Sequence, residues 1–199
     1  MAEYKHLLVR KEGPIAIMTI NRAESFNTLE PESWAEIDKA AVEIEAMEGV
    51  RAVVINAAGQ HFSAGIDLKQ LETFNSELVM KSVAHSQAAY SKWEDLPVPV
   101  IAAIQGICFG SATELILACD IRIAAQNARI AIPEVRYGLA PDMGGTTRLT
   151  RLVGTGQAKR MIIACDEVDA EEAKSIGLVE KVVETDRLME EAMKMAERI

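Results

Sequence analysis

The chain has few of the residues that stabilise small secreted or zinc-binding proteins. Among its 199 residues there are three cysteines, Cys108, Cys119 and Cys165, and no Cys-x-x-Cys pair. An odd number of cysteines, with no histidine at ligand spacing, argues against a disulfide framework and a structural zinc site. We therefore expect no bound metal and a location in a reducing compartment, the cytoplasm.

Long apolar runs and an excess of positive charge are also missing. The longest apolar run, residues 98–104, is far shorter than the roughly 20 residues that span a bilayer. The first ten residues contain no apolar signal-peptide core. Acidic residues outnumber basic ones by 30 to 21, which gives a net charge of −9. We expect neither nucleic acid nor a membrane as a partner, because both present anionic surfaces.

The charge is spread unevenly along the chain. Residues 97–165 contain four acidic and seven basic residues, whereas residues 166–199 contain eleven acidic and five basic ones. A basic, apolar middle segment suits an anionic small molecule. A buried core with solvated arginines would have the same composition, so both interpretations stay open.

Short β-branched runs alternate with helical patterns and predict an α/β fold. No linker-like stretch interrupts them, so we assign residues 1–199 to a single domain whose last part, from about residue 166, is helical. We expect strands at 6–10, 15–20, 52–56, 98–104, 121–124 and 128–132. We expect helices at 32–47, 76–94, 111–119, 146–152, 157–165, 170–176 and 186–199, the last one capped by Asp186.

Several motifs for phosphate binding or nucleophilic catalysis are absent or incomplete. The sequence has no P-loop, and the dinucleotide-like start at residues 154–156 continues to Lys159, where that pattern needs a small residue. The stretch His61-Phe62-Ser63-Ala64-Gly65 lacks the first glycine of a nucleophile elbow. Ser63 is therefore not favoured as a nucleophile.

Two carboxylates in apolar surroundings are the strongest candidates for chemistry. Glu114 lies early in an apolar predicted helix, where burial would raise its pKa, and Glu134 follows the end of a strand. Two carboxyls in different environments suit a general acid and a general base. The alternative is a first-turn glutamate favoured by the helix dipole and a hydrated loop glutamate, and spacing alone does not decide between them.

Two loops of small residues, 62–65 and 106–112, could bring a ligand close to backbone N–H groups. Two N–H groups directed at one carbonyl oxygen would stabilise an enolate-like charge. Tight turns around a packed helix would need the same residues, so this interpretation also stays open.

Taken together, three segments resemble the crotonase (enoyl-CoA hydratase/isomerase) superfamily. They are HFSAGIDLKQL at residues 61–71, PVIAAIQGICFGSATELILACDIRIA at residues 99–124 and IPEVRYGLAPDMGGTTRLTRLVG at residues 132–154. The resemblance runs in order along the whole chain. It implies a spiral of repeated β-β-α units and an acyl-CoA thioester substrate, with coenzyme A as part of the substrate and no separate cofactor.

The resemblance also implies roles for individual residues. The backbone N–H groups of Ala64 and Ser111 would form an oxyanion hole for the thioester carbonyl. Glu114 and Glu134 match the two glutamates with which hydratases position and split water. The residues that would line the coenzyme A path are Ala64, Gly65, Ile66, Asp67 and Gly110.

The chain departs from the hydratase pattern at four places. Ser111 and Ala112 stand in a run where hydratases usually have glycines, and Glu24 stands where the family often has lysine. Asp142 replaces a typical glycine and resembles the acid of dienoyl-CoA isomerases, although those enzymes usually carry aspartate at the position of Glu114. Family members also continue past residue 199 into further helices that build a trimer, so the C-terminal helical region looks incomplete.

The leading prediction is hydration of a 2-enoyl-CoA in a homotrimer or a dimer of trimers. The first alternative is double-bond isomerisation of a dienoyl- or 3-enoyl-CoA with Asp142 as a proton carrier. The second is a non-catalytic acyl-CoA-binding protein. The scaffold alone does not fix the chemistry.

Overall fold

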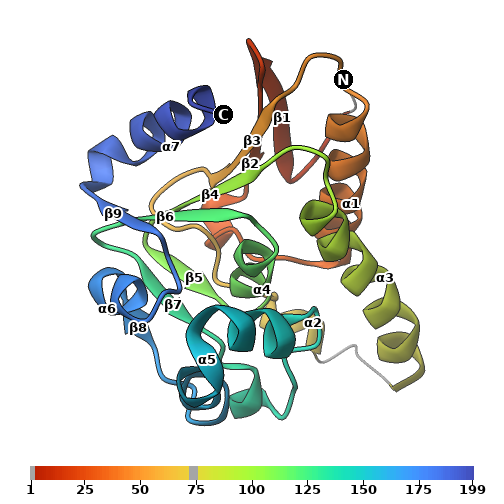
Figure 1. Cartoon of the computed structure of the whole chain (residues 1–199). Coiled ribbons are helices and arrows are strands. Elements are labelled where there is room, and N and C mark those ends of the chain that lie inside the picture. Colours follow the sequence, from red (N-terminus) through yellow and green to blue (C-terminus); the bar gives the residue numbers. More distant parts are fainter. Residues whose placement is uncertain (1–2, 72–75) are drawn as a thin grey trace.

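The computed structural model describes residues 3–71 and 76–199, and its centre is a six-stranded sheet (Figure 1). The first two strands, β1 (Leu7–Glu12) and β2 (Ile15–Ile20), pair as an antiparallel hairpin. The sheet continues in parallel through β3 (Ala52–Ala57), β4 (Val100–Ile104), β6 (Ile121–Ala125) and β9 (Lys181–Val183). A smaller sheet contains β5 (Ile107–Phe109), β7 (Arg129–Ala131) and β8 (Val168–Asp169).

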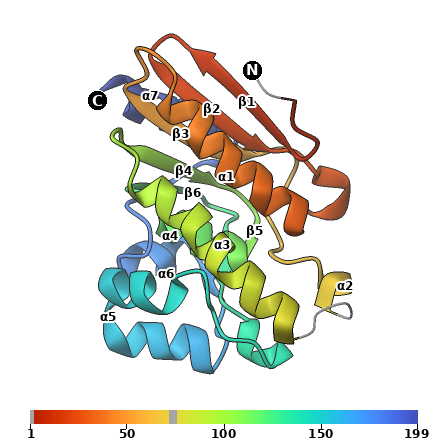
Figure 2. The ribbon, with the colours of Figure 1, turned by 90° about the vertical axis from the view of Figure 1, so that its right-hand side faces the viewer.

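Helices cover both faces of the large sheet, as uninterrupted apolar parallel strands require. On one face, α1 (Pro31–Glu45) and α3 (Ser76–Glu94) lie side by side (Figure 2). On the other face, α7 (Leu188–Glu197) packs its buried Leu188, Ala192 and Ala196 against alternate strand residues such as Ile17 and Val54. The remaining helices are α2 (Leu68–Leu71), α4 (Ser111–Leu117), α5 (Gly145–Ile163) and α6 (Ala170–Ser175), with 3₁₀ turns at Ala23–Ser25, Glu134–Tyr137 and Thr185–Arg187.

The connection from β5 to α4 depends on Gly110. Its backbone has φ 57° and ψ −127°, a conformation that residues with a Cβ avoid. Its N–H donates to the carbonyl of Ala131 at 2.9 Å, which joins the end of β5 to the end of β7. A Cβ at this position would lie 2.9 Å from the Oε1 atom of Glu134. Gly110 therefore lets the start of α4 and the segment after β7 approach each other closely.

The predicted α/β class is confirmed, and the structure corrects several details of the elements. The two helices expected at 146–152 and 157–165 are both present, because the range Gly145–Ile163 that carries the label α5 contains two helical segments separated by a kink at Gly154, whose φ of 75° and ψ of 163° are not helical. Asp186 is not a helix cap, because it lies in a 3₁₀ turn and α7 begins after it at Leu188, with no side-chain cap. The segment from residue 166 is only partly helical, since it contains β8 and β9. In the described part of the chain, no helix has the length and apolar character needed to cross a membrane.

Candidate active site

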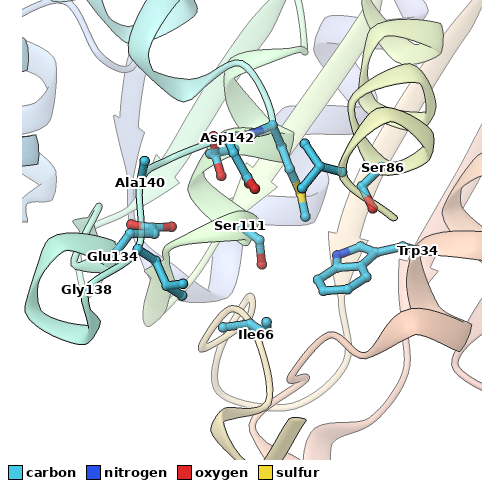
Figure 3. Close-up of a pocket in the computed structure, with 12 residues that line it drawn as sticks. Trp34, Ile66, Ser86, Ser111, Glu134, Gly138, Ala140 and Asp142 are labelled. Carbon is cyan, nitrogen blue, oxygen red and sulfur yellow. Dashed lines mark hydrogen bonds between the residues drawn. The ribbon is translucent and has the colours of Figure 1, made fainter. Parts of the chain in front are cut away.

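A cavity of about 240 Å³ lies where α1, α3 and α4 meet the segment between β7 and α5 (Figure 3). It brings together three carboxyl groups from α4 and the segment between β7 and α5, two serines and an indole. The described residues that line it are Trp34, Ile66, Val83, Ser86, Ser111, Glu114, Glu134, Gly138, Leu139, Ala140, Asp142 and Met143. All three predicted catalytic carboxyls, those of Glu114, Glu134 and Asp142, therefore face one cavity.

Glu114 is the deepest of these carboxyls, with 1% of its surface exposed. Its Oε1 atom accepts hydrogen bonds from the backbone N–H groups of Met143 at 2.9 Å and Gly145 at 2.8 Å. Burial, followed by the negative charge of Glu134, raises the pKa of Glu114 to about 8, and the two N–H groups oppose this shift. The glutamate is thus fixed in position and able to keep a proton near neutral pH.

The neighbouring Thr113 holds α4, and with it Glu114, against the small sheet. Its buried hydroxyl lies 2.7 Å from the carbonyl oxygen of Cys108 in β5 and 2.9 Å from that of Ala131 in β7. Because Thr113 connects α4 to both strands, the direction of the Glu114 side chain is set by the core.

Glu134 opens the 3₁₀ turn that follows β7, directly after Pro133. Its Oε2 atom is buried and has no hydrogen-bond partner among the described residues. Burial is the main cause that raises the pKa of Glu134 to about 7, and the charge of Asp142 adds to it. An unpartnered carboxylate oxygen at a cavity wall is available to a water molecule or a substrate.

Asp142 lines the same cavity from the loop before α5. It is half-buried, and burial raises the pKa of its carboxyl group. Its charge also acts on both glutamates and raises their pKa values. The three carboxyls are therefore electrostatically linked, and Asp142 belongs to the site that the sequence indicated.

The structure disagrees with the prediction that the backbone N–H of Ala64 is available to bind the thioester carbonyl. The N–H of Ala64 donates to the carbonyl of Phe26 at 3.0 Å, so it is already occupied. The N–H of Ser111, at the first residue of α4, has no acceptor among the described residues and borders the cavity. The prediction of Ala64 as an oxyanion donor is thus wrong in this structure, whereas that of Ser111 stays a prediction that the geometry allows.

The free N–H of the 64–67 loop belongs to Ile66. Leu29 pairs with the residues on either side, donating to the carbonyl of Gly65 at 2.8 Å and accepting from the N–H of Asp67 at 2.9 Å. The backbone N–H and C=O of Ile66 therefore point away from Leu29. The N–H of Ile66 has no acceptor among the described residues. Sequence spacing carries no signal for this choice, because it depends on which neighbouring segment pairs with the loop.

Only some of the other residues predicted to bind substrate line a cavity. Ala64, Ile66 and Gly110 line a second cavity, whereas Gly65 packs against β5. A smaller cavity of about 80 Å³ is lined by Ala64, Ile66 and Gly110 and shares Ile66, Glu134 and Leu139 with the first one. Gly65, with φ 85°, packs so closely on β5 that a Cβ would lie 2.6 Å from the carbonyl oxygen of Phe109. Neither Gly65 nor Asp67 lines these two cavities.

The basic residues of the middle segment do not line the main cavity. Arg122 is buried and pairs with Glu180 at 2.5 Å, and Arg148 pairs with Glu94 at 2.7 Å. Among the described lining residues of the main cavity there is no lysine or arginine. The positive excess of this segment is thus partly neutralised by acids from other segments, and it does not mark the site.

A family model, curated proteins and solved structures that are similar to this chain all belong to one protein family. The model of the family described as enoyl-CoA hydratase/isomerase matches residues 10–199. Short-chain-enoyl-CoA hydratase of Clostridium acetobutylicum is 40% identical over 198 residues, which cover 99% of this chain and 76% of that protein. Crotonyl-CoA hydratase of Syntrophomonas wolfei is 37% identical over 197 residues, 98% of this chain and 76% of that protein. The crystal structure of an enoyl-CoA hydratase from Bacillus anthracis matches with a TM-score of 0.93 at 38% identity, over 98% of this chain and 76% of that chain, which confirms the predicted fold.

Proposed function

Since this chain belongs to the enoyl-CoA hydratase/isomerase family, we propose that it adds water across the double bond of a 2-enoyl-CoA thioester. The observation that supports this most strongly is the convergence of Glu114 and Glu134 on one cavity beside two free backbone N–H groups. Coenzyme A is part of the substrate, and we propose no further cofactor.

Ile66 and Ser111 supply the electrostatic part of the proposed reaction. Both N–H groups have no acceptor among the described residues, and both residues border the cavity. A thioester carbonyl between them would accept two hydrogen bonds, which strengthen as negative charge moves onto the oxygen in the enolate. Loss of one such donor typically costs about 3–4 kcal/mol of transition-state stabilisation.

Glu114 and Glu134 supply the proton chemistry. Burial raises the pKa values of Glu114 and Glu134 to about 8 and about 7, so the pair together holds close to one proton between pH 7 and 8. Addition of water needs one carboxylate to take a proton from water as its oxygen bonds to C3. It also needs one carboxyl group to give a proton to C2 as the enolate collapses. A singly protonated pair meets both needs.

Asp142 supports a second candidate function, isomerisation of a dienoyl- or 3-enoyl-CoA. Asp142 lines the cavity and its carboxyl group has a raised pKa, so this group can act as an additional proton carrier beside the two glutamates. The two reactions differ in mass balance, because hydration adds one water to the acyl group and isomerisation adds nothing.

Incubation with crotonyl-CoA and with a 3,5-dienoyl-CoA, followed by mass spectrometry and ultraviolet absorbance, tests both functions. Hydration predicts a 3-hydroxyacyl-CoA from the first substrate. Isomerisation predicts a product of unchanged mass and a conjugated spectrum from the second. Binding of both thioesters without any product would favour the non-catalytic alternative.

We also propose that the chain forms a homotrimer or a dimer of trimers in the cytoplasm. Exposed apolar side chains such as Ile163, Tyr137 and Val135 support association, and the three buried free cysteines are compatible with a reducing compartment. Light scattering of the purified protein measures the number of subunits directly.

A further inference from the structure

The loop before α5 binds Glu114 through its backbone, and the helix α3 binds the same loop from the opposite side. The N–H of Met143 donates to Glu114 Oε1 at 2.9 Å. The carbonyl of Asp142 belongs to the same peptide unit and accepts a hydrogen bond from the side chain of Gln87, in α3, at 2.6 Å. Because the C=O and N–H of a trans peptide point in opposite directions, Gln87 and Glu114 bind the two ends of one rigid unit.

Arg148 binds the next carbonyl of the loop. Its Nη1 atom donates to the carbonyl of Met143 at 2.8 Å. Its Nε and Nη2 atoms lie 2.8 Å and 2.7 Å from Oε2 of Glu94, and Nη2 also donates to the hydroxyl of Ser91 at 3.2 Å. The guanidinium is buried and packs so closely on Gly144 that a Cβ on this glycine would collide with Nη1. Arg148 therefore connects Met143 to α3 from a fixed position.

Local helix preference does not account for an arginine at this place. Arg148 is the fourth residue of α5, near the positive end of the helix dipole, where a cation is unfavourable. Its partners on α3, together with Gln87, follow one another at steps of four and three residues, so they share one face of that helix. The contacts between this face and the loop thus offset the local cost.

We infer that Gln87 and Arg148 are positioning residues for the proton transfer of Glu114 and act through the backbone of Asp142 and Met143. This inference rests on the proposed function, since it concerns hydration by Glu114. Neither Gln87 nor Arg148 lines the main cavity. Both line a separate cavity of about 420 Å³ that shares Asp142 and Met143 with it. Each therefore acts on Glu114 from outside the substrate space.

The hydrogen bond from Met143 affects both the position and the ionisation of Glu114. This N–H stabilises the carboxylate and lowers its pKa, so a longer hydrogen bond raises that pKa further. The titratable groups that face Glu114 are Glu134 after β7, Asp142 before α5 and Tyr90 in α3. A neutral substitution of Gln87 changes none of these charges, so a shift in such a variant reports the hydrogen bond.

Two variants release the loop from α3 without changing the net charge. Gln87→Met removes the amide donor at an exposed position. Arg148→Lys keeps the charge but cannot bind Glu94 and the Met143 carbonyl through separate nitrogen atoms. Each should lower kcat for crotonyl-CoA by about tenfold at unchanged KM, because a small displacement of a catalytic group slows the reaction without removing a substrate contact. Each should also move the high-pH limb of the kcat profile to higher pH.

Gln126→Met and Arg151→Lys are the matched controls. Gln126 is exposed after β6, and Arg151 is exposed one turn after Arg148 in α5. Both controls should have the wild-type kcat, KM and pH profile. Thermal melts of all four variants confirm folding, and because Gln87 is exposed, its variant tests the inference even if Arg148→Lys does not fold.

Infrared spectroscopy of the protein without substrate supplies a readout that needs no turnover. The C=O band of protonated Glu114 is identified by its absence in Glu114→Gln, and its disappearance with rising pH gives the pKa of Glu114. In Gln87→Met and Arg148→Lys this band should persist to higher pH than in the wild-type protein and the controls.

A wild-type kcat in Gln87→Met would overturn the inference and leave the proposed function standing. A lower kcat with an unshifted infrared titration would also overturn the inference, because the loss would then not act through the N–H of Met143. Absence of hydration by the wild-type protein would instead contradict the proposed function, and the infrared titration would still show whether Gln87 and Arg148 control the ionisation of Glu114.

Discussion

The Oε1 atom of Glu114 and the backbone of Gly145 are in contact so close that no side chain fits between them. The N–H of Gly145 donates to this oxygen at 2.8 Å, and a Cβ on Gly145 would lie 2.7 Å from the same atom. The first turn of α5 thus positions the carboxyl group through a glycine, and the carboxyl group must move if that glycine is replaced.

Gly145→Ala should lower kcat for hydration by about 100-fold, because a displacement of about 1 Å of a catalytic group has an effect of this size. Gly156→Ala, in the same helix, is the control, since a Cβ there has open space. Steady-state kinetics of both variants, with thermal melts to confirm folding, test the contact. Equal kcat values for the two variants would show that Gly145 does not position Glu114.

Glu114→Gln and Glu134→Gln should each reduce kcat for crotonyl-CoA by about 10²–10⁴-fold. Glutamine has nearly the same shape as glutamate but cannot exchange a proton, so the loss reports proton transfer and not packing. Glu45→Gln, at an exposed position of α1, should leave the rate unchanged. Turnover near the wild-type level in either cavity variant would exclude hydration by this pair.

Asp142→Asn should shift the pH profile of kcat/KM for hydration to lower pH. The charge of Asp142 raises the pKa values of both Glu114 and Glu134, so its removal lowers both. The wild-type profile should be bell-shaped with its maximum between about pH 7 and about pH 8, where the pair holds one proton. Asp95→Asn, at an exposed position, is the control and should leave the profile in place.

The same variant separates the two candidate reactions. If the chain is an isomerase that uses Asp142, Asp142→Asn abolishes turnover of a 3,5-dienoyl-CoA and does not merely shift its pH optimum. An unshifted hydration profile would mean that the carboxyl of Asp142 is not electrostatically linked to the glutamates.

The elements that the sequence predicted well are those with a strong local pattern. The helix at Ser76–Glu94 and the strand at Ile15–Ile20 have the predicted bounds, because their apolar spacing is regular over several turns or residues. The three-residue strands β5 and β9 were not predicted, since each depends on pairing with a distant strand and has too few residues to show a period. The β8 strand has only two residues.

The site was predictable to the extent that side-chain chemistry shows in the sequence. Glu114 and Glu134 stood out as acids among apolar neighbours, and the structure brings them to one cavity. Whether Ala64 or Ile66 has the free N–H depends on the hydrogen bond to Phe26 and the pairing with Leu29, which no spacing reveals. Trp34 was not among the predicted site residues, because nothing in the local sequence shows that its side chain lines the cavity.

The free energy of unfolding should fall as the pH rises from about 5 to about 8, and Glu114 should account for part of that fall. Burial raises the pKa of Glu114 from 4.5 to about 8 in the folded protein. Below pH 4.5 both states hold the proton, whereas between pH 4.5 and 8 the unfolded chain loses it and the folded protein keeps it. Over this range ionisation therefore favours the unfolded state, by on the order of 2–5 kcal/mol in total.

Glu114→Gln removes this titration. The free energy of unfolding of the variant minus that of the wild-type protein should therefore be larger at pH 9 than at pH 5. Urea denaturation of both proteins at the two pH values gives the difference directly, and the titration of all other groups largely cancels. The oxygen of the neutral amide can still accept hydrogen bonds from the N–H groups of Met143 and Gly145, so the variant should fold. A stability difference that is the same at both pH values would mean that Glu114 ionises at its ordinary pKa. Glu114 would then hold no proton near neutral pH, and the proposed sharing of one proton between Glu114 and Glu134 would be wrong.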